Sequence, residues 1–175
     1  MARSFLFLLL FVPFTRQPGH LIDWNATRKL TWSDFLGNPD NNNENAALTC
    51  SNINFKYGYG TAGFNFTISC RFDKRQSWGR IKNDYVLAHE QGHFDLAEIY
   101  ARKLNKALKE YHYNERTVSK DVSKIYQDLM DEHHKVQNDY DVETDHSLNK
   151  DKQQTWFKKI VDDLRKYDGY ADYRK

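Results

Sequence analysis

The residues with the clearest capacity for chemistry are His89, Glu90 and His93, which lie within the segment His89-Glu90-Gln91-Gly92-His93. Two histidines four positions apart on a helix project from the same side, one turn apart, so both imidazoles can reach one metal ion. The glutamate that follows the first histidine can contact a water molecule beside that metal. Two neutral ligands, a general base and room for water are typical of a zinc hydrolase.

The surrounding sequence favours one long helix from about Asp84 to Tyr111. This stretch lacks proline, and its apolar residues recur at helical spacing together with both histidines. The two imidazoles should therefore face the protein interior. They could be core histidines satisfied by hydrogen bonds, but metal binding is favoured, because burying two unpaired imidazoles on adjacent turns is costly without a shared partner.

A catalytic zinc usually has three protein ligands, and the candidates for the third are His146, Asp141, His133, Glu98 and Asp95. Glu98 lies about 180° around the helix from the first histidine, and Asp95 also faces away. His133 lies on the inward face of the second predicted helix, where a hydrogen-bonded core histidine explains it equally well. We expect His146 to be the third ligand, because its loop can bend toward the site. Asp141 is the alternative, as a ligand or as the partner of a histidine.

Tyr140 is a candidate for a second catalytic role. Its hydroxyl could donate a hydrogen bond to the oxyanion that forms when water attacks a carbonyl group. The chain contains 11 tyrosines, and ordinary packing is the alternative explanation for any one of them.

Composition and patterning predict a single α+β domain. The chain has 175 residues, of which 39% are hydrophobic, and this is enough for one core. The net charge of +2 gives no indication of nucleic-acid binding. We expect a β-rich part followed by three helices: short strands at 21–24 and 29–32, a hairpin from about Ala46 to Phe72, and helices at 84–111, 117–137 and 150–167. Residues 138–147 should form a polar connection, and the tail after Asp168 should fray.

The first 20 residues are typical of a signal peptide. An apolar run from Ser4 to Phe14 follows Arg3 and is too short to span a bilayer. We therefore expect residues 1–20 to be removed, with residues 21–175 exported to the periplasm or the medium and without a stable membrane span. An uncleaved anchor is the alternative.

An exported chain can hold a disulfide, and the only cysteines are Cys50 and Cys70, which flank the predicted hairpin. Their symmetric placement favours a bridge. The register that pairs Ile53 and Phe55 with the apolar face of the other strand opposes it, because Cys50 and Cys70 then point to opposite sides of the sheet. The sequence alone does not decide whether this disulfide forms.

Several segments resemble a bacterial family of exported proteins that is described as secreted zinc-dependent proteases and classed as a domain of unknown function. The matching segments are residues 29–35, Ser77-Trp78, 89–98, 140–146, and Gln153 or Gln154 with Trp156. The resemblance implies a zincin-like site that uses His89, Glu90 and His93, with the segment 140–146 nearby. One departure is Ser147, where glycine is expected.

The sequence therefore favours a secreted zinc metallopeptidase that acts on a protein or peptide substrate. Zn²⁺ would be held by His89, His93 and His146, with Glu90 as the general base and Tyr140 as an auxiliary donor. The alternative is a non-catalytic envelope module in which zinc is structural, and this would require a closed set of four protein ligands.

Overall fold

A computed structural model describes residues 19–174, apart from Asn43 and Ala62, and has the predicted α+β architecture. Strands β1 (Leu21–Asp23), β4 (Gly63–Asp73) and β3 (Ser51–Gly60) form an antiparallel sheet in the order β1-β4-β3, and β2 (Ala47–Leu48) pairs with β5 (Trp78–Gly79). The helices are α1 (Asp84–Glu110), α2 (Val118–Thr144) and α3 (Lys150–Lys166). Two 3₁₀ segments, η1 (Trp32–Asp34) and η2 (Asp168–Arg174), complete the described elements.

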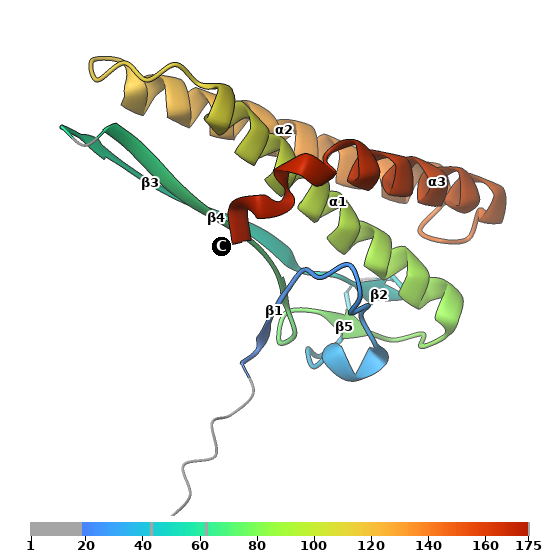
Figure 1. Ribbon diagram of the computed structural model, residues 1–175. Helices are drawn as coiled ribbons and strands as arrows, with labels where there is room; N and C mark the ends of the chain where they lie inside the picture. The colour runs from blue at the N-terminus through green and yellow to red at the C-terminus, as the bar shows by residue number, and fades with distance from the viewer. Residues whose placement is uncertain (1–18, 43, 62, 175) are drawn as a thin grey trace, which may run out of the picture.

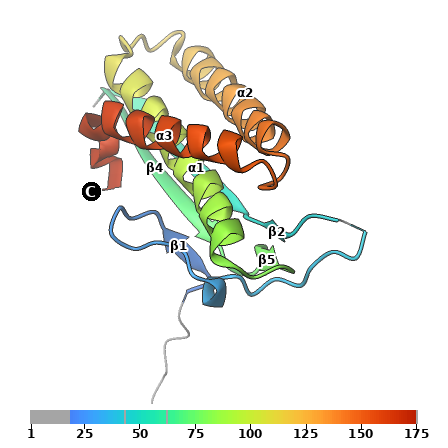
Figure 2. The same cartoon turned by 90° about the vertical axis from the view of Figure 1, so that its right-hand side faces the viewer.

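Helix α1 is the central layer of the molecule. The β3–β4 hairpin runs along one side of it, and α2 and α3 cover the opposite side (Figures 1 and 2). Two groups of buried side chains fill the core. One lies between α1, the hairpin and the first half of α2, and the other lies between α1, α2 and α3. A helix that is covered on both sides needs a wide apolar surface, and 16 of the 27 residues of α1 are buried.

The hairpin follows from alternating side chains, as the sequence predicted. Ile53 lies opposite Cys70 in the register, and Phe55 lies opposite Ile68, so the apolar side chains of both strands share the face that packs on the helices. Cys50 precedes Ile53 by three positions and therefore projects to the other face from Cys70. Both cysteines are free, so the disulfide that the sequence left open is not formed.

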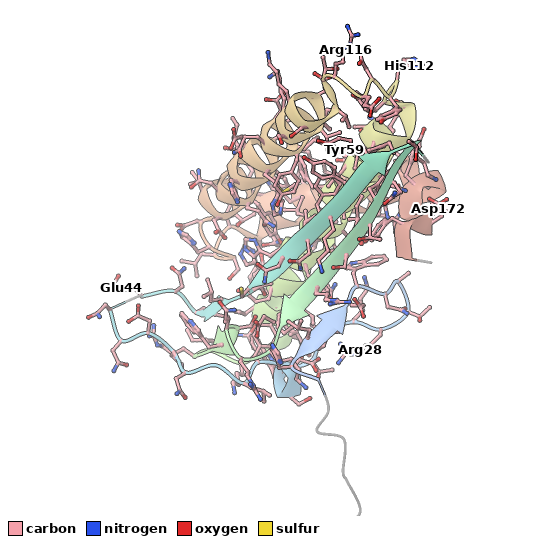
Figure 3. The ribbon with its side chains drawn as sticks, turned by 90° about the vertical axis from the view of Figure 1, so that its left-hand side faces the viewer. Arg28, Glu44, Tyr59, His112, Arg116 and Asp172 are labelled. Carbon is pink, nitrogen blue, oxygen red and sulfur yellow. The ribbon has the colours of Figure 1, made fainter. Side chains whose placement is uncertain are left out.

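The far end of the hairpin carries aromatic side chains. Figure 3 shows Tyr59 at this end of β3, on the same end of the molecule as the α1–α2 connection, which carries His112 and Arg116. The ring of Tyr113 stacks on Phe64 with a centroid distance of 6.5 Å, so this connection packs against the hairpin tip. The loop that carries Glu44 lies at the opposite end of the molecule (Figure 3).

The predicted bounds of α1 and α3 are confirmed to within one residue. Asn83 and Asn149 cap the two helices, because their side chains accept hydrogen bonds from the backbone N–H groups of Val86 and Lys152. The predicted end of the second helix at Gln137 is wrong, since α2 continues to Thr144. Residues 138–144 are polar, but they include no glycine or proline that would end a helix.

The turn after α2 has an unusual backbone. Asp145, His146 and Ser147 have φ angles of 48°, 49° and 78°, which lie in the left-handed region that favours glycine. The expectation of glycine at position 147 therefore has a conformational reason. This turn reverses the chain and starts α3.

Two further expectations are wrong. Residues 29–32 do not form a strand: Asp34 accepts hydrogen bonds from the N–H of Thr31 and from Arg28, and these contacts hold the segment in the η1 turn. The tail does not fray either, because η2 packs on α1, where Asn105 donates to the carbonyl of Tyr170 at 2.8 Å.

No helix among residues 19–174 is long and apolar enough to cross a membrane. The predicted signal peptide falls almost wholly on residues 1–18, which lie outside the described residues, so it stays a prediction.

Candidate metal centre

Two helices bring together three potential ligands. Helix α1 presents His89 and His93 one turn apart, and their Nε2 atoms lie 3.1 Å from each other. Helix α2 adds Asp141, whose Oδ1 lies 3.1 Å from Nε2 of His89 and 3.0 Å from Nε2 of His93. These three side chains form the group of residues in the described part of the chain that could hold a metal ion.

The other ring nitrogens of the two histidines contact buried amides. Nδ1 of His89 lies 2.7 Å from Oε1 of Gln153 on α3, and Nδ1 of His93 lies 2.6 Å from Oε1 of Gln137 on α2. These contacts fix the plane of each ring, and they aim both Nε2 atoms at Asp141. Hydrogen-bond partners of this kind usually accompany metal-binding histidines.

The charges around the three side chains favour a cation between them. Burial lowers the pKa of His93, but the hydrogen bond with Asp141 and the charges of Glu90 and Asp141 outweigh it and raise that pKa to about 9. Burial likewise opposes ionisation of Asp141, yet its contacts with His89 and His93 hold its pKa well below the usual range. The donor set, two imidazoles and one carboxylate, suits zinc and similar divalent metals.

Glu90 lies beside this group, and one of its carboxylate oxygens lacks a hydrogen-bond partner. The residue is 3% exposed, and its Oε2 atom is buried without a donor in contact. An unpartnered buried carboxylate oxygen is costly and indicates that a polar molecule or ion completes its surroundings.

Glu90, both histidines and Asp141 line an open cleft of about 360 Å³. The segment 45–51 forms one wall of this cleft, and His133 and His134 of α2 contribute to the lining. Burial and the neighbouring charges of His134 and His93 lower the pKa of His133 to about 4, so His133 is neutral at pH 7. The cleft gives a ligand access to the candidate metal centre.

The structure does not bring His146 into the group of three ligands. Its Nδ1 lies 3.8 Å from Oδ1 of Asp141, and its side chain is 50% exposed. The physical reason is the length of α2, which carries Asp141 into the site as a helical residue and leaves His146 in the turn that departs from it. The residue named as the alternative, Asp141, occupies the third position.

Tyr140 lies in a different place from that expected of an oxyanion donor. It is fully buried, and its ring stacks on the ring of His89 with a centroid distance of 4.5 Å. Its hydroxyl donates to the carbonyl of His89 at 3.3 Å and accepts a hydrogen bond from Gln153, and it is not part of the cleft lining. In this structure Tyr140 packs on His89 and does not line the cleft.

The two acidic candidates on α1, Glu98 and Asp95, point away from the centre, as expected. Glu98 is fully buried and accepts hydrogen bonds from Arg102 at 2.7 Å and from the hydroxyl of Tyr173 in η2. Asp95 accepts a hydrogen bond from Nε1 of Trp24 at 2.6 Å. Both carboxylates hold α1 to neighbouring segments.

The glutamines that contact the histidines were not among the candidates for the site. Gln137 lies one turn before Asp141 on α2, and this spacing would have placed both on one helix face. Gln153 belongs to the segments that carry the family resemblance, but its type alone gives no indication of a metal site.

Comparison with known proteins identifies the family of this chain. No curated protein and no solved structure gives a significant match. Residues 37–147 match the family model described as "Bacterial protein of unknown function (DUF922)". The matched range contains Glu90, the two histidines and Asp141, and it ends just after α2. The chain therefore belongs to this bacterial family of unknown function.

Proposed function

We propose that the chain is an exported zinc-dependent hydrolase that cleaves peptide bonds. In this proposal His89, His93 and Asp141 hold the zinc ion, and Glu90 is the general base. The observation that carries the proposal is the unpartnered Oε2 of Glu90, which is buried beside three converging ligand atoms in an open cleft. The signal peptide at residues 1–20 and the protein or peptide substrate are part of the same proposal.

The number of ligands favours catalysis over a structural role. Structural zinc sites are usually closed by four protein ligands, whereas catalytic sites have three and leave a position open. The described residues bring three ligand atoms together, and the cleft reaches them. A bound zinc ion supplies Lewis acidity and lowers the pKa of water toward neutrality.

The protein's own contribution is to place and move a proton. Oε2 of Glu90 would accept the proton of the attacking water and then deliver it to the nitrogen of the leaving amine. Oε2 is buried without a donor in contact, so no other hydrogen occupies the position that this proton would take. Tyr140 and the two glutamines hold the histidines in place.

The decisive variant is Glu90→Gln, which keeps the shape of the side chain and removes the base. We expect one zinc ion per chain in both the wild type and the variant by elemental analysis. Hydrolysis of a mixed library of quenched fluorescent peptides should fall by about 10²–10⁴-fold. Glu132→Gln on the exposed side of α2 is the matched control and should keep full activity. Equal turnover by Glu90→Gln and the wild type would contradict the proposed mechanism.

A further inference from the structure

We infer that Gln137 and Gln153 are positioning residues that fix which ring nitrogen of each histidine ligand carries the proton. The role of this arrangement in metal binding rests on the proposed zinc site. The orientation of the two amides is determined by contacts away from the metal, so it can be derived independently of any ion.

The orientation of Gln137 follows from a backbone carbonyl. Its Nε2 lies 3.0 Å from the carbonyl oxygen of His93, and a carbonyl oxygen only accepts hydrogen bonds. The other end of the amide, Oε1, must therefore face Nδ1 of His93 at 2.6 Å. Since Oε1 can only accept, Nδ1 of His93 carries a hydrogen. The same Nε2 lies 2.9 Å from Nε2 of His133, which accepts from it.

The orientation of Gln153 follows from Tyr140. The Tyr140 hydroxyl uses its single hydrogen to donate to the carbonyl oxygen of His89 at 3.3 Å. It must therefore accept from Nε2 of Gln153, which leaves Oε1 facing Nδ1 of His89 at 2.7 Å. Nδ1 of His89 thus carries a hydrogen as well. Gln153 is fully buried, so water does not compete for these bonds.

In the neutral form of both rings, each Nε2 presents a lone pair. These two nitrogens and Oδ1 of Asp141 are three acceptors within 3.1 Å of one another. A cation among them relieves the repulsion, and a divalent ion balances the charges of Asp141 and Glu90. Because the glutamines are neutral, they orient the histidines without adding negative charge to this buried site.

The test compares substitutions at Gln153 in the otherwise intact chain. In Gln153→Met the acceptor is lost, so we expect neutral His89 in the metal-free protein to move its hydrogen to Nε2 and donate to Asp141. Long-range ¹⁵N–¹H NMR spectra report the position of this hydrogen. Competition with a chromophoric chelator should show a 10–100-fold loss of zinc affinity. Gln154→Met, one position further along the exposed side of α3, should change neither measurement.

Gln153→Glu is the conservative variant, because a carboxylate also accepts from His89. It should keep the hydrogen on Nδ1, and it provides the test if Gln153→Met does not fold. Neutral His89 with its hydrogen on Nε2, in Gln153→Glu or in the wild type, would overturn the inference, as would unchanged zinc affinity in a folded Gln153→Met. Absence of zinc binding by the wild type would contradict the proposed function instead, and the metal-free spectra would still decide the role of Gln153.

Discussion

Oδ1 of Asp141 lies 3.0 Å from Nε2 of His93, although 48 positions separate the two residues in the chain. The contact depends on the pairing of α1 with α2 and on the continuation of α2 to Thr144. The candidate metal centre is therefore a product of helix packing, with one turn of α1 supplying the histidines and the last turns of α2 supplying the carboxylate.

The third ligand can be identified by substitution. Asp141→Asn should lower zinc affinity by more than about 100-fold, because loss of a ligand exceeds the effect of losing an outer partner. His146→Ala should change the affinity by less than about threefold, since His146 lies outside the group of ligands. Isothermal titration of each variant measures these affinities. Asp139→Asn is the control, because the Asp139 carboxylate pairs with Lys135 and lies outside the group of ligands. A loss for His146→Ala as large as that for Asp141→Asn would assign His146 as a ligand.

The metal-free protein should lose stability as the pH rises from 6.5 to 9. The pKa of His93 is raised from 6.5 to about 9, so its protonated form is stabilised by folding. This contribution is fully present below pH 6.5 and is lost as the pH approaches 9, and it amounts to at most about 3 kcal/mol. Urea unfolding at several pH values, in the presence of a chelator, measures how the free energy of unfolding changes with pH. A His93→Gln variant should show a flatter profile, and a flat wild-type profile would contradict the raised pKa.

The pKa of His133 is lowered rather than raised, so His133 should affect the stability of the protein at a lower pH than His93 does. Folding lowers the pKa of His133 from 6.5 to about 4, because burial and the charges of His134 and His93 disfavour its charged form. Its neutral form is accommodated without cost above pH 6.5, and stability falls as the pH drops from 6.5 to 4. Unfolding curves for His133→Gln should show a shallower acid limb than the wild type. An identical acid limb would show that other groups control acid unfolding.

Gly92→Ala tests the close approach of α1 and α2. A Cβ atom at position 92 would lie 2.9 Å from Cζ of the buried Tyr140 ring, so the ring must move. We expect a net loss of about 2 kcal/mol in the free energy of unfolding, despite the better helix propensity of alanine. Zinc affinity should also fall, because Tyr140 supports His89. Gly169→Ala, where the space is open, should stay within about 0.5 kcal/mol of the wild type.

Ser147→Gly should stabilise the protein. Ser147 has a φ of 78°, and glycine adopts this conformation without the steric cost of a side chain. We expect a gain of about 1 kcal/mol after the added freedom of the unfolded chain is subtracted. Ser123→Gly, at an exposed position in the second turn of α2, is the matched control and should lose about 0.5 kcal/mol. Equal effects at both positions would show that the turn does not store strain.

The sequence predicted α1 well because its signals agree. The Asn83 cap, the absence of proline and the helical spacing of apolar residues all indicate the same helix. The hairpin was predicted for a similar reason, since alternation defines the face and the face defines the register. Local signals of this kind were sufficient to place the two histidines and Glu90 together on α1, where they line one cleft.

The prediction was weaker where a local pattern depends on distant contacts. Residues 138–144 have the polarity of a loop, but their helix is stabilised by the packing of Tyr140 against α1 and α3. Because residues 138–144 were expected to form a loop, His146 was ranked above Asp141 as the third metal ligand. The helical spacing of His133, Gln137 and Asp141 was the available signal, because the three residues follow each other at one-turn intervals.

The position of α3 has a consequence for the smallest working unit of this chain. The family match ends at residue 147, whereas Trp156 and Ile160 of α3 cover Leu96 and Ile99 of α1. A fragment cut at that boundary would retain every proposed ligand and would expose an apolar stripe to solvent. Such a fragment should self-associate, so the smallest stable unit of this chain must include the third helix.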